Sequence, residues 1–132
     1  MDATSVPAPL AEQYLILDTG PFRVAVRSSD AAFFDTLSYF YRDCVRHDGP
    51  HFLDFDIRIR RVAGLRRLVR PQALFEIDGL RPFEPQPAEN AFPSYEWGLN
   101  WCIATSAHRY LMLHAGTVAL GGSGMILPGH PG

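Results

Sequence analysis

The sequence contains no lysine, because its twelve basic residues are all arginine. This excludes Schiff-base chemistry, a lysine general base and the phosphate-binding lysine of a nucleotide loop from these 132 residues. Cysteine is also scarce: Cys44 and Cys102 lie far apart and outside any Cys-x-x-Cys pattern. Neither a disulfide framework nor a zinc site is therefore indicated, and we expect two buried thiols.

Long apolar runs are absent as well. No stretch approaches the about 20 apolar residues that cross a bilayer. The first ten residues carry an acidic residue and two prolines in place of the basic start and apolar run of a secretory signal. Neither charge is in large excess, since twelve basic and fourteen acidic residues give a net charge of −2. We therefore expect a soluble, cytoplasmic protein that binds neither nucleic acid nor membrane.

The length and composition predict one ordinary folded core. A chain of 132 residues with 47% hydrophobic and 20% charged residues has the composition of a globular domain and no room for an interdomain cleft. Strands are predicted at 13–18, 22–27, 53–60, 65–70, 73–77, 110–113, 117–120 and 125–127, and helices at 30–43 and 94–107. The fold class expected is α+β, with a mostly antiparallel sheet and two helices.

Local patterns support several of these elements. Residues 53–60 alternate apolar and charged side chains, which is the period of a strand with one wet face. Ser29 or Asp30 can cap the first helix. The second helix is apolar nearly all round, so we expect Trp97 and Trp101 to be buried. Between 82 and 93, closely spaced prolines indicate an ordered loop that Phe83 and Phe92 anchor.

Charged residues near the middle of the chain allow two interpretations. Asp54 and Asp56 share a strand face and could act as paired carboxylates, but Arg58 and Arg60 lie on the same face and favour a solvated, ion-paired strand. The six arginines between positions 58 and 70 could form a hairpin that docks phosphate or an acidic peptide. They could equally form a charged face that discourages edge-to-edge pairing of strands.

The histidines give weaker indications. His47 and His51 flank a Gly-Pro turn and lack a third ligand at metal spacing, so no metal site is expected. His108 and His114 border the predicted strand 110–113. Neither has a nucleophile in a Gly-x-Ser-x-Gly elbow.

The last residues have the form of the start of a phosphate-binding loop. Such a loop needs a buried strand followed by glycines whose backbone amides surround a phosphate. The strand at 125–127 is followed by Gly129 and Gly132. In the pattern G-x-x-x-x-G-K-[ST], Gly129 is the first glycine and the second would fall five positions later, beyond residue 132. A plain Gly-Pro-rich tail is the alternative interpretation.

Several strings in the second half occur in an order known from one family. They are Phe92-Pro93, EWGLNWCIA from Glu96 to Ala104, HRYLMLHA from His108 to Ala115, and ILPG from Ile126 to Gly129. Together they resemble the N-terminal half of the HprK-related kinase A family, over roughly residue 53 to the end. The resemblance places the chain in the amino-terminal part of an HPr kinase/phosphorylase-like P-loop kinase, with a fold that leads into an incomplete P-loop kinase core.

The resemblance has consequences for activity. It implies that full-length relatives bind ATP and magnesium and transfer phosphate in the manner of P-loop protein kinases. The resemblance leaves the phosphoryl acceptor open, with a protein substrate or peptide as the candidate partner. Gly129 and Gly132 match the opening of the phosphate loop, and His114 matches the histidine that starts the strand pair leading into it. Because the loop lysine, the magnesium-binding hydroxyl and the acidic metal ligand are missing, we expect no catalytic residue, no metal ligand and no bound cofactor in this chain, which would be inactive alone.

The resemblance also suggests an organisation. Residues 1–90 would form an accessory α+β region and 91–132 the start of the kinase core, and exposed strand edges would favour a homo-oligomer. The alternative function is a non-catalytic module that recognises an acidic protein or peptide through its Arg-rich hairpin.

Overall fold

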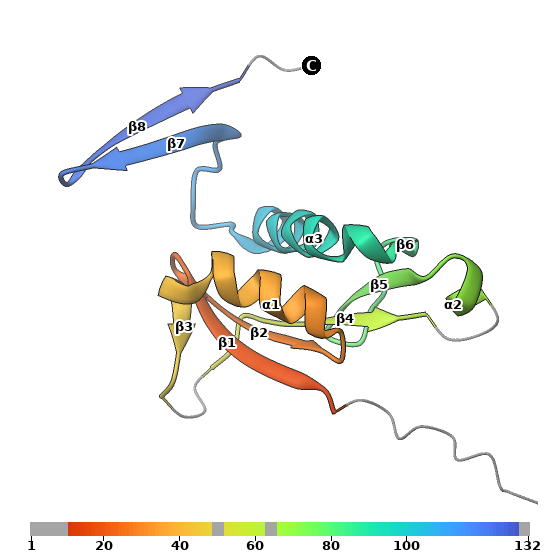
Figure 1. Cartoon of the computed structure of the whole chain (residues 1–132). Helices are drawn as coiled ribbons and strands as arrows, with labels where there is room; N and C mark the ends of the chain where they lie inside the picture. Colours follow the sequence, from red (N-terminus) through yellow and green to blue (C-terminus); the bar gives the residue numbers. More distant parts are fainter. Residues whose placement is uncertain (1–10, 49–51, 63–65, 130–132) are drawn as a thin grey trace, which may run out of the picture.

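The computed structural model describes residues 11–48, 52–62 and 66–129, which form a six-stranded sheet, two long helices and a separate hairpin (Figure 1). The sheet order is β3-β1-β2-β4-β5-β6, and every neighbouring pair is antiparallel except β2 and β4. The strands are β1 (Gln13–Thr19), β2 (Phe22–Ser28), β3 (Val45–Arg46), β4 (Phe55–Arg61), β5 (Gln72–Ile77), β6 (Gln86–Pro87), β7 (Ala115–Leu120) and β8 (Ser123–Pro128). The helices are α1 (Ala31–Phe40), α2 (Arg66–Val69) and α3 (Ala91–Ser106), and the 3-10 turns are η1 (Arg42–Cys44) and η2 (Ala88–Asn90).

The expected α+β class with a mostly antiparallel sheet and two helices is confirmed. The long helices α1 and α3 lie on one face of the sheet (Figure 1). The core lies between these helices and the sheet and contains Leu17, Val26, Leu37, Ile57 and Tyr95. No helix in the described ranges covers the opposite face of the sheet (Figure 1). Along the strands, charged side chains on that face therefore alternate with apolar side chains that point into the core.

The chain enters α1 through a hydrogen-bonded cap. The Asp30 carboxylate accepts a hydrogen bond from the Phe33 amide at 3.3 Å, and the Ser28 hydroxyl donates to the Ile59 carbonyl at 2.8 Å. The first contact satisfies an amide of the first helical turn, and the second ties the end of β2 to the parallel strand β4. The cap predicted at Ser29 or Asp30 is thus formed by Asp30, and α1 ends at Phe40, where a 3-10 turn follows shortly after.

The orientation expected for α3 was wrong. Trp97 and Trp101 are 58% and 40% exposed, whereas Tyr95, Leu99 and Cys102 face the core. The physical reason lies at Gly98: a Cβ there would overlap the Phe75 ring of β5. The missing side chain lets α3 approach β5 with this face, and the tryptophans are left on the other side.

Two predicted strands were also wrong. Residues 66–69 of the expected strand 65–70 form the short helix α2, whose arginines and leucine are good helix formers. The segment 110–113 is irregular and links α3 to β7. The loop predicted between 82 and 93 is confirmed only in part. Phe83 packs on Phe75 with ring centroids 5.5 Å apart, but residues 86–90 form β6 and η2, and Phe92 and Pro93 lie in the first turn of α3.

No helix in the described part of the chain has both the length and the apolar composition that crossing a membrane requires. The predicted boundary at residue 90 stays a prediction. α3 starts at Ala91 and packs on the sheet built from the residues before it.

The contact at Gly98 gives a first prediction. Gly98→Ala is expected to lower the free energy of unfolding by about 1–3 kcal/mol, because overpacking against Phe75 outweighs the better helix propensity of alanine. Urea unfolding measures the change. The control Ala104→Gly alters an exposed position of the same helix and is expected to cost only about 0.5–1 kcal/mol. A stabilised Gly98→Ala protein would contradict the close approach.

Candidate functional site

The hairpin β7–β8 forms a sheet of its own. Its register pairs Val118 with Met125 and Gly116 with Leu127. Gly121 and Gly122 form the turn with φ of 57° and 79°. Positive φ at both central residues is the geometry of a two-residue turn that matches the twist of the flanking strands, which explains the paired glycines.

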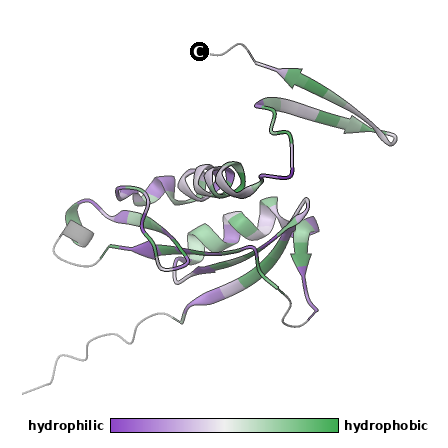
Figure 2. Ribbon diagram, turned by 180° about the vertical axis from the view of Figure 1, so that it is seen from behind, coloured by the Kyte–Doolittle hydropathy of each residue, from purple (hydrophilic) through white to green (hydrophobic). Residues whose placement is uncertain are grey.

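Both faces of this hairpin are apolar and exposed. No charged residue occurs between 115 and 129, and Val118, Met125 and Ile126 are 57%, 62% and 55% exposed. Val118 and Met125 lie on one face, and Ile126 lies on the other. Strands that are apolar on both faces are typical of sheets covered on both sides, so the sequence of this hairpin is patterned for burial. Figure 2 shows hydrophobic colour on both strands, away from the main sheet.

A groove of about 790 Å³ separates the hairpin from the outer side of α3. Trp97, Trp101 and Ala104 line it from the helix, and Leu127 and Gly129 line it from the end of the hairpin. Trp97 is held in place by Phe83, whose ring centroid lies 4.2 Å away. Sequence reasoning missed this role of the tryptophans, and the signal was Gly98, which marks the side of α3 that can approach another element closely.

The structure brings two of the three predicted cofactor-binding residues, Gly129 and His114, to this groove. Gly129 directly follows β8, and no atom lies within 4 Å of the position a Cβ would take there. His114 immediately precedes β7 and lines the same groove. Gly132 lies outside the described residues.

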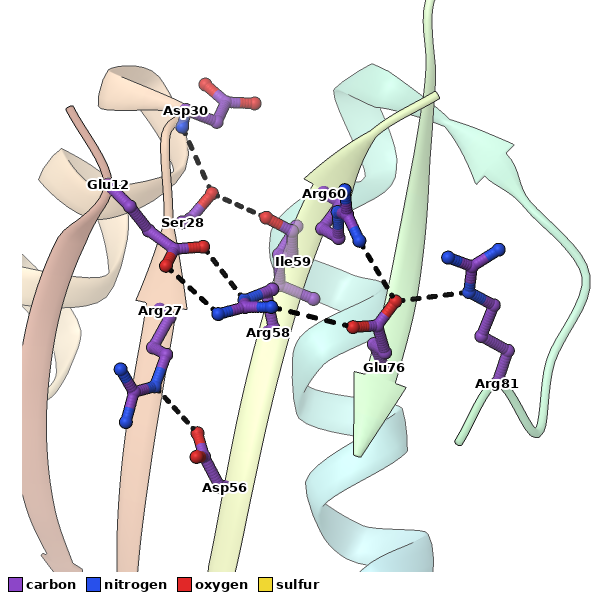
Figure 3. A network of polar contacts seen from close by, with 10 residues as sticks. All are labelled: Glu12, Arg27, Ser28, Asp30, Asp56, Arg58, Ile59, Arg60, Glu76 and Arg81. Carbon is purple, nitrogen blue, oxygen red and sulfur yellow. Dashed lines mark hydrogen bonds and ion pairs between the residues drawn. The ribbon is translucent and has the colours of Figure 1, made fainter. Parts of the chain in front are cut away.

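The open face of the main sheet carries an ion-pair network centred on Glu76 (Figure 3). The Glu76 side chain is only 9% exposed and lies 3.8 Å from Arg58, 3.6 Å from Arg60 and 3.1 Å from Arg81. A carboxylate that is nearly buried needs such partners, because desolvation of an unpaired charge is costly. Sequence reasoning missed Glu76, although a single acid inside the otherwise apolar strand 73–77 was a signal.

The predicted charged residues mostly bind one another. Asp56 pairs with Arg27 at 3.0 Å, and Asp54 accepts a hydrogen bond from the Arg23 amide at 2.8 Å. Arg58 also binds Glu12 at 2.9 Å. These contacts correspond to the ion-paired strand interpretation and leave the two aspartates with separate partners.

The remaining arginines of the predicted hairpin differ in their ion pairing. Arg61 pairs with Asp30 at 2.8 Å. Arg70 is exposed and forms no ion pair with another described residue. The side chains of Arg66 and Arg67 lie outside the described part of the chain. The arginines therefore do not form the continuous hairpin face that was expected, because α2 replaces the second strand.

The histidines and cysteines add no metal or nucleophilic site among the described residues. No group of three or more His, Cys, Asp or Glu side chains could hold a metal ion within 11–48, 52–62 and 66–129. His47 is exposed, and His51 lies outside those ranges. Burial raises the pKa of the Cys102 thiol to about 11, so this thiol stays protonated at neutral pH and is a poor nucleophile. Cys102 is buried as expected, and Cys44 is half-buried.

Comparison with known proteins found no matching family model, curated protein or solved structure. The resemblance to the HprK-related kinase A family therefore stays a prediction from the sequence strings.

The apolar hairpin gives a second prediction. Val118→Thr with Met125→Thr makes one face polar while keeping a good strand former at Val118. We expect weaker fluorescence of a dye that binds apolar surface, less self-association in size-exclusion chromatography, and a change in unfolding free energy below about 0.5 kcal/mol. Leu68→Thr, at a residue 80% exposed elsewhere, should leave dye binding unchanged. Unaltered dye binding in the double variant would mean that this face is already covered.

The Glu76 network gives a third prediction. Glu76→Gln removes the charge that three guanidinium groups share, and we expect a loss of about 1–3 kcal/mol in the free energy of unfolding. The matched control is Asp43→Asn, whose side chain is 89% exposed and lies 3.9 Å from Arg42. It should change stability by less than about 0.5 kcal/mol. Equal changes in the free energy of unfolding for the two variants in urea titrations would show that the buried ion pairs of Glu76 stabilise the protein no more than an exposed pair does.

Proposed function

We propose that this chain is the amino-terminal part of an ATP-dependent kinase of the HprK-related type, with Gly129 as the first glycine of the phosphate-binding loop. On this proposal the chain alone transfers no phosphate. It contributes the accessory region and the strand pair that leads into the loop, and the full-length enzyme would phosphorylate a protein or peptide.

The observation that carries the proposal is the hairpin. β8 is an apolar strand without charged neighbours, and a glycine follows it directly. A strand buried on both faces and followed by a glycine-containing turn is the local framework of a phosphate-binding loop. A hairpin that served only as a surface element would be expected to alternate apolar and polar side chains.

The groove beside the hairpin supports the same proposal. Trp97 and Trp101 give α3 an apolar outer side, although its inner side is already buried on the sheet. A helix with two apolar sides belongs between two layers of structure. The arrangement is that expected where α3 separates the accessory sheet from a further α/β core.

Catalysis by these residues alone is not expected on chemical grounds. Phosphoryl transfer depends on positioning the phosphates and neutralising their charge, for which the loop lysine and the magnesium ligands are essential parts. The chain has no lysine, and its described residues hold no candidate metal cluster. Full-length relatives would use ATP and magnesium, and Gly129 would contribute only a backbone that can approach a phosphate closely.

The acidic-partner alternative has less support. Arg58, Arg60 and Arg61 already bind Glu12, Glu76 and Asp30 within the chain. An acidic peptide would have to compete with Glu12 and Glu76 for the donors of Arg58 and Arg60, and Arg61 would offer only the donors that Asp30 leaves unused.

A fourth prediction tests the kinase proposal at the level of the coding sequence and the protein. The reading frame after residue 132, or a frameshifted continuation of it, is expected to encode Gly-Lys-Ser or Gly-Lys-Thr so that the glycine falls five positions after Gly129. A stop codon with nothing similar downstream would contradict the proposal. The purified 132-residue chain is expected to hydrolyse no ATP above background in the presence of magnesium. ATP hydrolysis that disappears in Gly129→Ala would refute the expected inactivity of the chain alone.

A further inference from the structure

A second pocket lies at the other end of α3, far from the hairpin groove. It has a volume of about 670 Å³ and is lined by the first turns of α1 and α3, by the end of β4 and by the segment around the start of β5. Small-molecule sites typically occupy about 300–1,000 Å³. Phe33, Ala91 and Phe92 supply apolar wall, and Arg61, Arg70 and Gln72 supply polar groups.

Arg61 is held in position by a buried carboxylate. Asp30 is 8% exposed, and its Oδ2 lies 2.8 Å from a terminal nitrogen of Arg61. Its Oδ1 accepts from the Phe33 amide at 3.3 Å, so both oxygens of Asp30 are engaged. A guanidinium has five N–H donors, and this ion pair occupies one of its nitrogens. The pair therefore fixes the Arg61 side chain while leaving donors that can serve a ligand.

Arg70 supplies a second cation at the same pocket. Its side chain is exposed and forms no ion pair with another residue in the described ranges. Glu89 lies on the lining as well, and it is the one acid of the pocket that has no ion pair among the described residues. The two arginines are balanced by Asp30 and Glu89, so the described lining of the pocket carries no net charge. This favours a singly charged anion over a dianion such as a phosphate monoester.

We propose that this pocket binds a small organic monocarboxylate with an apolar or aromatic body. The carboxylate would lie between Arg61 and Arg70, since a guanidinium binds a carboxylate through parallel N–H donors. The apolar body would lie against Phe33 and Phe92. This site is separate from the hairpin groove and from the nucleotide function proposed above.

The fifth prediction uses 3-phenylpropionate as the probe, with 3-phenylpropanol as its neutral analogue and phenyl phosphate as the dianion. Two-dimensional NMR of the 132-residue chain is expected to show saturable shifts around Phe33, Gln72 and Phe92 with the carboxylate. The alcohol and the phosphate should each bind about tenfold more weakly. Equal affinity for the alcohol, tighter binding of the phosphate, or no saturable shift at millimolar carboxylate would each overturn the proposal.

Variants assign the contribution of each charge. Arg70→Gln is expected to weaken 3-phenylpropionate binding about tenfold, and Glu89→Gln to strengthen it about twofold. Ala32→Phe places a ring into the pocket from an exposed position of α1 and should abolish binding. Arg42→Gln, in η1 just beyond the opposite end of α1, is the matched control and should leave the affinity unchanged. Arg61 is not substituted, because its loss would leave the buried Asp30 carboxylate without its ion-pair partner. An unchanged affinity in Arg70→Gln would refute the assigned anion contact.

Discussion

The close approach of α3 to β5 at Gly98 determines how the rest of the surface is used. Because the Phe75 ring occupies the space of a side chain at position 98, only this side of the helix can face the sheet. Tyr95 and Leu99 then enter the core, and the two tryptophans turn outward. The outward indoles line the groove beside the hairpin, so one packing contact in the core also produces the apolar surface on which the proposed function depends.

The sequence alone could predict the elements whose pattern was unambiguous. The strand β4 could be predicted from its alternation, and a helix cap at Ser29 or Asp30 from its residue types, because each pattern involves residues close in the chain. The orientation of α3 could not be predicted, since two of its sides are similarly apolar. Which side faces the sheet depends on Phe75, which lies far away in sequence. The strand expected at 65–70 was wrong because six residues contain too little pattern to separate a strand from a turn of helix.

The candidate sites were predicted to a different extent. Gly129 follows from a linear motif and His114 from the family resemblance, and the structure brings both to one groove. The Glu76 network and the Asp30–Arg61 pair depend on register between separate strands and on the crossover through α1, which no local pattern encodes. The absence of lysine gains a structural meaning here. A guanidinium offers several donors in a fixed plane, so it can bind one carboxylate within the protein and still present nitrogens elsewhere.

The two proposed sites lie toward opposite ends of α3 and depend on different interactions. The groove beside the hairpin is apolar and has no charged side chain on its strands, so its natural complement is further protein that buries it. The pocket at the first turn combines aromatic wall with positioned guanidinium groups, so its natural complement is a small anion. α3 contributes to both sites, with Ala91 and Phe92 lining the pocket and Trp97 and Trp101 lining the groove.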